Sequence, residues 1–102
     1  MKFPDDPILR EMIPEFIDWW VSETTENLPS ILERKDTDEL YRFGHTLKGS
    51  GRQFGFTVLA SYGVALEGHA KSAQWDHAAA IRHEILQQLQ TIKSAFASHG
   101  EH

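Results

Sequence analysis

The chain has 102 residues, 40% of them hydrophobic and 11% aromatic, which is enough for one domain with a core of its own. It contains no cysteine, and this excludes disulfides, thiolate nucleophiles and cysteine-ligated metal sites. The net charge of -5 argues against a nucleic-acid or anionic-membrane surface, and the chain has neither a signal-type segment nor a run of about 18 apolar residues, so we expect a cytoplasmic protein without membrane contact.

The first helical pattern contains two prolines. Apolar residues recur at helical spacing from Leu9 to Leu32, and Pro14 and Pro29 interrupt them. We expect a short lead-in helix and then one long helix. Pro14 fits a first turn, where a missing N–H does no harm, and Pro29 is expected to bend the long helix.

Three further helices are predicted after the long one. Asp36 and Glu39 have the side chains of a capping box, which begins a helix that runs to about Phe54. Apolar residues at helical offsets from Leu59 predict the next helix, and the last begins near Trp75. No strand signal and no internal repeat is present.

These helices are expected to pack into one bundle. Short connections between long amphipathic helices imply antiparallel neighbours, so the predicted fold is all-α, an antiparallel up-down four-helix bundle with a short N-terminal lead-in helix. We expect a single domain over residues 1–102, with residues 1–6 and 98–102 frayed, and a monomer.

The helix that ends near Phe54 carries a histidine on its polar face. With about 100° per residue, the apolar residues and two glycines fall within roughly 60° of Leu40 and face the core. His45 lies at about 140° from Leu40. Because the stretch from residue 41 to 53 carries +3 and no acid, while the remainder carries -8, the imidazole is expected to point to solvent in a local positive patch.

The glycines in this helix are expected to have a structural or functional role, because each destabilises a helix interior by about 1 kcal/mol relative to alanine. Gly44 and Gly51 lie on the buried face, where a missing side chain lets a neighbouring helix come close. Gly49 lies on the exposed face, one turn beyond His45. We infer that the missing side chain at Gly49 leaves room for a large molecule to approach the His45 ring.

Residues at fixed spacing follow the histidine. Lys48 and Gly49 come three and four residues after His45, Gly55 comes ten residues after it, and the pair Leu66-Glu67 lies in the next predicted helix. This arrangement resembles the histidine-containing phosphotransfer (HPt) domain, whose signature is His-x-x-Lys-Gly, a glycine ten residues past the histidine, and a Leu-Glu pair. The stretch 54–59 is also similar to the phosphorylated domain of chemotaxis histidine kinases, a relative of the same fold.

The resemblance implies a phosphorelay carrier. His45 would accept a phosphoryl group from a receiver-domain aspartyl phosphate and pass it to another receiver aspartate. Lys48, one turn from His45, would neutralise phosphoryl oxygens, and Glu67 would hold Nδ1–H so that Nε2 attacks. The carrier would have no ATP-dependent kinase activity of its own, and the sequence contains no Gly-x-x-x-x-Gly-Lys-Ser/Thr loop.

The expected partners are response-regulator receiver domains and an upstream sensor or hybrid histidine kinase. No cofactor is expected, because the receiver supplies its own aspartate and Mg²⁺. Arg52 could add a second cation, and the pair Arg52-Gln53 replaces the small or polar residues often found there, which bears on partner identity. The residues expected at the phosphate or partner-docking surface are Gly49, Arg52, Tyr41, Arg42 and Gln53.

Other interpretations remain open. The chain could be an interaction module that docks a receiver without being phosphorylated, or the phosphoacceptor domain of a chemotaxis-type histidine kinase. A hydrolase with His45 as general base needs a concave pocket and a partnered nucleophile, but the helical wheel places His45 on a convex face. No metal site is expected, because zinc-type spacing is absent from the other histidines: His69, His77, His83, His99 and His102.

Overall fold

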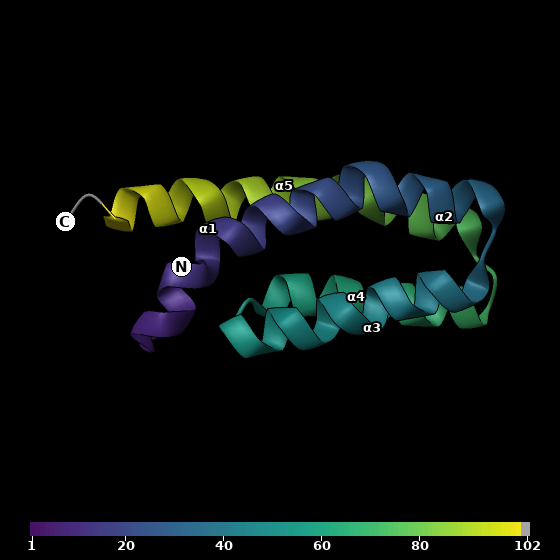
Figure 1. Ribbon diagram of the computed structural model, residues 1–102. Helices are drawn as coiled ribbons and strands as arrows, with labels where there is room; N and C mark the ends of the chain where they lie inside the picture. Colours follow the sequence, from purple (N-terminus) through teal and green to yellow (C-terminus); the bar gives the residue numbers. More distant parts are fainter. Residues whose placement is uncertain (101–102) are drawn as a thin grey trace.

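The computed structural model describes the backbone of residues 1–100 and the side chains of residues 1–98. This part of the chain contains no strand, so the fold is all-α. Figure 1 shows the first helices running alongside α5, with α3 and α4 lying next to each other across the core. In chain order the elements are α1 (Pro7–Ser22), the short π-helix η1 (Glu23–Asn27), α2 (Leu28–Arg34), α3 (Thr37–Phe54), α4 (Thr57–Lys71) and α5 (Trp75–Gly100).

The first helix begins at Pro7. The Asp6 side chain accepts a hydrogen bond from the Ile8 N–H at 2.9 Å, and Pro7 occupies the start of the helix, where its missing N–H does no harm. The expectation of a separate lead-in with Pro14 in a first turn was wrong, because Pro14 lies inside α1. An internal proline removes a backbone hydrogen bond, and Figure 1 shows the first turns of α1 at an angle to the rest.

The π-helix η1 lies directly before Pro29, where the sequence predicted a bend. The Leu28 N–H bonds the carbonyl of Glu23, five residues back, and Pro29 follows at the start of α2. Because a proline ring clashes with the carbonyl four residues earlier, a wider turn in front of it lets the helix continue. The flanking residues keep right-handed helical backbone angles, so α1, η1 and α2 form one long helical rod.

The later helices lie close to where the sequence predicted them. The Asp36 side chain caps α3 by accepting a hydrogen bond from the Glu39 N–H at 3.1 Å. Only half of the capping box forms: the Asp36 N–H donates to the Ile31 carbonyl at 3.2 Å, and the Glu39 carboxylate accepts a hydrogen bond from Arg42 at 3.0 Å. Helix α5 continues to Gly100, and Phe3 is only 5% exposed. The fraying expected of residues 1–6 and 98–102 stays a prediction. Residues 101–102 lie outside the described part.

The chain reverses between α3 and α4 at Gly55. This glycine has a left-handed φ of 78°, which a residue with a side chain adopts only at a cost. Its N–H bonds the carbonyl of Arg52 at 3.1 Å, and the N–H of Phe56 bonds that of Gly51 at 2.7 Å. These two hydrogen bonds satisfy the last carbonyls of α3, and the chain then reverses and runs back along α3 as α4.

Helices α3 and α4 are in backbone contact. A Cβ added to Gly44 would lie 2.7 Å from the carbonyl oxygen of Gly63, and one added to Gly63 would lie 2.6 Å from that of Gly44. A Cβ on Gly51 would lie 2.8 Å from the Ala60 nitrogen. Since these distances are shorter than van der Waals contact, the close approach exists only because the side chains are absent. Gly44 and Gly51 therefore serve packing, as predicted, and Gly63 is their counterpart on α4.

The core lies between the long rod, α5 and the α3–α4 pair. Trp20 is fully buried there and Trp19, beside it, is exposed at the edge, which matches the apolar periodicity. In the described part of the chain, no helix is both long and apolar enough to cross a membrane. The largest fully buried hydrophobic side chains include Ile13, Leu28, Leu40, Leu47, Leu59, Leu66, Ile85, Leu89 and Ile92.

Candidate functional site

The close approach of α3 and α4 brings three polar residues together. His45 and Lys48 lie one turn apart on α3, and Glu67 faces them from α4. His45 Nδ1 lies 3.1 Å from Glu67 Oε2. Lys48 Nζ lies 2.9 Å from Oε1 and 3.1 Å from Oε2 of the same carboxylate. The contact expected between Glu67 and the histidine ring is therefore present, and Lys48 joins it.

The two edges of the His45 ring have different surroundings. The side chain is 62% exposed, while that of Glu67 is 10% exposed. Because an ionised carboxylate only accepts hydrogen bonds, Nδ1 carries the proton in this contact. In the neutral ring Nε2 then keeps a free lone pair, and it has no hydrogen-bond partner within residues 1–98. The ring presents a nucleophilic nitrogen to solvent.

Neighbouring side chains stabilise the ionised form of Glu67. Burial raises the pKa of Glu67, but hydrogen bonds from Lys48 and His45, the positive charge of Lys48 and a hydrogen bond from Tyr41 together lower that pKa below the usual value of 4.5. The carboxylate is ionised at neutral pH. It can therefore hold the Nδ1–H tautomer of His45 and the ammonium of Lys48 together.

An aromatic ring and a second lysine lie beside this group. The rings of Tyr41 and His45, one turn apart on α3, are 6.0 Å apart between centroids and within 13° of parallel. Lys71 Nζ, from the last turn of α4, lies 5.5 Å from the centre of the Tyr41 ring. Sequence reasoning did not include Lys71. Its position four residues after Glu67, on the same helical face, was the available signal.

The other residues expected at the docking surface lie outside this hydrogen-bonded group. Gly49 is exposed, and a Cβ there would meet nothing within 4 Å, so the space above it is open. The side chains of Arg52 and Gln53 are exposed and have no hydrogen-bond partner among residues 1–98. Arg42 forms an exposed ion pair with Glu39 at 3.0 Å, so part of its charge is already compensated.

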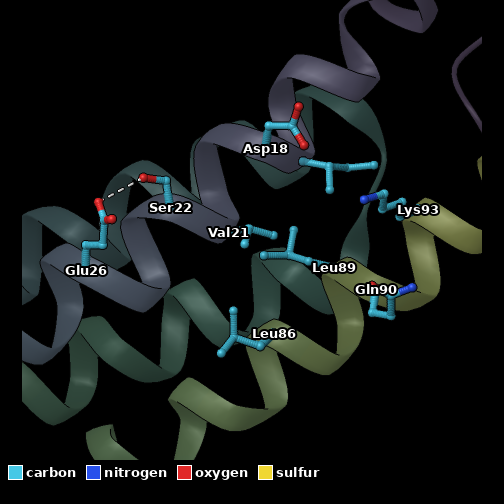
Figure 2. A pocket seen from close by; sticks show the side chains of 9 residues that line it. Asp18, Val21, Ser22, Glu26, Leu86, Leu89, Gln90 and Lys93 are labelled. Carbon is cyan, nitrogen blue, oxygen red and sulfur yellow. Dashed lines mark hydrogen bonds between the residues drawn. The ribbon is translucent and has the colours of Figure 1, made fainter.

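A hollow lies elsewhere, between α5 and the α1–η1 part of the long rod. Figure 2 shows its walls, including Asp18, Leu89 and Lys93, and a hydrogen bond of 3.2 Å from Ser22 to Glu26. Its volume is about 420 Å³, and no residue of α3 or α4 lines it. The histidine with an open nitrogen thus stands on the outside of the bundle and takes no part in this hollow.

The histidines of the α4–α5 connection lie close together, which their spacing along the chain did not suggest. The ring centroids of His69 and His77 are 5.4 Å apart, and His69 Nδ1 lies 3.0 Å from the Gln74 side-chain oxygen. Among the residues that the structure describes, no three His, Asp or Glu side chains form a group that could hold a metal ion.

Comparison with known proteins gives one family. The model of the Hpt domain family matches residues 15–100, from the middle of α1 to the end of α5. No curated protein and no solved structure matches the chain significantly. Hpt domains are phosphocarriers of histidine phosphotransfer in two-component signalling, where they interact with receiver domains and kinases. Because the match covers most of the chain and contains the His45–Glu67 site, the protein belongs to the Hpt domain family.

Proposed function

We propose that the protein is a phosphorelay carrier that accepts a phosphoryl group on Nε2 of His45. The observation that carries the proposal is the 3.1 Å contact between His45 Nδ1 and Glu67, made by a His45 side chain that is otherwise largely exposed. One ring nitrogen is occupied by a buried acceptor, and the other is open to a visiting domain. The up-down antiparallel order of the helices is part of the same proposal, because it sets the middle of α3 against the middle of α4.

The proposed reaction transfers a phosphoryl group between a carboxylate and an imidazole. The Nε2 lone pair of His45 attacks the phosphorus of a receiver aspartyl phosphate, and the aspartate oxygen leaves with its bonding pair as a carboxylate. The ring becomes positively charged, keeps its proton on Nδ1 and is stabilised by the Glu67 carboxylate. The reverse steps deliver the group to the aspartate of another receiver. The receiver would supply Mg²⁺, and this chain would need no cofactor.

Lys48 is the proposed partner of the phosphoryl oxygens. Its ammonium has three N–H donors and touches two oxygens of Glu67, so at least one donor remains for a third oxygen. Arg52, two turns beyond His45 and without an ion pair in the described part of the chain, is a proposed second cation. Gly49 would leave room for the receiver, and Tyr41, Arg42 and Gln53 would flank it.

Transfer from a phosphorylated receiver tests the proposal. The wild-type protein is expected to take up acid-labile, base-stable label, and His45→Gln is expected to take up none. Lys48→Ala should keep the helical circular dichroism and lose about tenfold or more in transfer rate, because an uncompensated phosphoryl charge raises the barrier.

The controls separate the alternatives. If His45→Gln labels as well as wild type, the site assignment is wrong. A protein that binds the receiver without taking label is a docking module, and one labelled by a chemotaxis-type kinase core with ATP but by no receiver is a phosphoacceptor of that class. Label from ATP alone would contradict a carrier without kinase activity.

A further inference from the structure

The plane of the His45 ring needs a support that Glu67 does not supply. A single hydrogen bond at Nδ1 does not by itself fix the plane of the ring, since the χ2 torsion about the Cβ–Cγ bond of a histidine side chain has a broad minimum. The side chain is 62% exposed, so the core does not pack against it. Attack on phosphorus in line with the leaving group requires a fixed direction for the Nε2 lone pair.

Tyr41 is placed to give that support. Its ring lies nearly parallel to the imidazole, with an interplanar angle of 13° and a centroid separation of 6.0 Å, within the range of aromatic pairs. Tyr41 is itself anchored from α4. Lys71 Nζ lies 5.5 Å from its ring centre, within cation–π range.

We propose that Tyr41 is a positioning residue for phosphotransfer, which holds the imidazole plane so that Nδ1 stays on Glu67 and Nε2 points outward. Lys71 completes the arrangement by holding the Tyr41 ring from α4. The positive charge that the imidazole gains on phosphorylation also favours the face of a tyrosine ring. This inference rests on the proposed function, and it assigns Tyr41 a role inside this protein in place of one in partner docking.

The test uses the complete unphosphorylated chain with ¹⁵N-labelled histidine. Nitrogen chemical shifts of His45 report the fraction of the Nδ1–H tautomer, which Glu67 favours, against the Nε2–H form that free histidine favours. Tyr41→Leu should shift the tautomer toward the Nε2–H form and slow transfer from a phosphorylated receiver by about tenfold. Tyr41→Phe keeps the ring, so it should stay within about threefold of the wild-type rate, with most of the Nδ1–H form retained.

Lys71→Met provides a second measurement if Tyr41→Leu does not fold, although Tyr41 is 37% exposed. It should move the tautomer in the same direction by a smaller amount, because the tyrosine ring stays beside the imidazole but loses its contact with Lys71 on α4. The matched controls are Tyr62→Phe, which removes the hydroxyl of the other tyrosine, and Lys93→Met, which removes a lysine on α5. Both should keep the wild-type tautomer and rate.

The proposal is overturned by an unchanged His45 tautomer in Tyr41→Leu, or in Lys71→Met if the first variant is unfolded. If transfer is nevertheless slower in Tyr41→Leu while the tautomer is unchanged, Tyr41 belongs to partner docking. Because the tautomer is measured without phosphate or partner, a wild-type protein that takes no label would contradict the proposed function and leave the tautomer result intact.

Discussion

At the scale of single residues, one carboxylate organises the site. Glu67 accepts hydrogen bonds from His45 and Lys48 on α3. Its side chain is nearly buried, and a buried carboxylate is stable only when charge and hydrogen bonds compensate its lost hydration. Glu67 therefore links the bundle's stability to the chemistry of the exposed ring.

Glu67→Gln tests this link through the pH dependence of stability. Because the folded-state pKa of Glu67 is lowered from 4.5, the carboxylate contributes stability that is present above about pH 4.5 and is lost as the pH falls through the folded-state pKa. At pH 7 the variant should unfold with a free energy about 1–2 kcal/mol smaller than wild type. Urea denaturation should show this difference closing below about pH 4.5.

A carboxylate on the surface serves as the control. Glu15 is exposed on α1 and has no hydrogen-bond partner in the described part of the chain. Glu15→Gln should change the free energy of unfolding by less than about 0.5 kcal/mol at every pH. A constant difference between Glu67→Gln and wild type down to pH 3 would mean that the Glu67 charge does not contribute to stability.

At the scale of helices, the contact between α3 and α4 sets the geometry of the site. Gly44 and Gly63 let the two backbones touch directly beside His45, and this brings Glu67 within hydrogen-bond distance of α3. Packed interiors do not deform to admit an extra methyl group without cost. The separation of these two helices, more than the helix propensity of either, decides whether the histidine has its partner.

Gly63→Ala should therefore be damaging. The added Cβ would lie 2.6 Å from the carbonyl oxygen of Gly44 and 2.8 Å from Cα of Lys48, both backbone atoms that must move. We expect a loss of about 2 kcal/mol or more in the free energy of unfolding, measured by urea denaturation. The nitrogen shifts of His45 should also move, because Glu67 is displaced from the ring.

Gly68→Ala is the matched control on the same helix. A Cβ there would meet nothing within 4 Å, so the substitution should stabilise the protein by up to about 1 kcal/mol through helix propensity. Equal effects of the two substitutions would show that propensity, and not the contact between backbones, governs these glycines.

At the scale of the whole molecule, the N-terminal segment joins distant parts of the bundle. The Phe3 ring makes edge contacts with Phe56, before α4, at 6.2 Å, and with Phe96, near the end of α5, at 5.2 Å. These contacts cover the end of the core where α3 turns into α4. The residues before the first helix therefore belong to the folded domain.

Phe3→Ala should destabilise the whole domain. A buried phenylalanine leaves a cavity when truncated, and we expect a loss of about 3 kcal/mol in the free energy of unfolding. Ile8→Ala, at a side chain that is 68% exposed, should change it by less than about 0.5 kcal/mol. If thermal unfolding gives the same midpoint for Phe3→Ala and wild type, the segment is not part of the cooperative unit.

Local features of the fold were predictable from the sequence alone. The Asp36 cap, the Gly55 turn and the outward direction of His45 depend on residues within a turn or two, and each is present in the structure. Pro14 was misplaced for a local reason as well: the cap at Asp6 and Pro7 begins the helix earlier, and the continuing helix tolerates a proline with a bend.

Contacts between helices were decided only by the tertiary structure. Family resemblance, not periodicity, pointed to Glu67, and nothing in the sequence pattern indicated that Lys48 would share its carboxylate. The spacing of Lys71 from Glu67 placed both on one face of α4 but did not show that Lys71 would lie over Tyr41. The packing of the Phe3 ring against Phe96 of α5 was likewise decided by the tertiary structure. The physical reason is that capping and periodicity act along one helix, whereas these contacts depend on how closely two backbones approach.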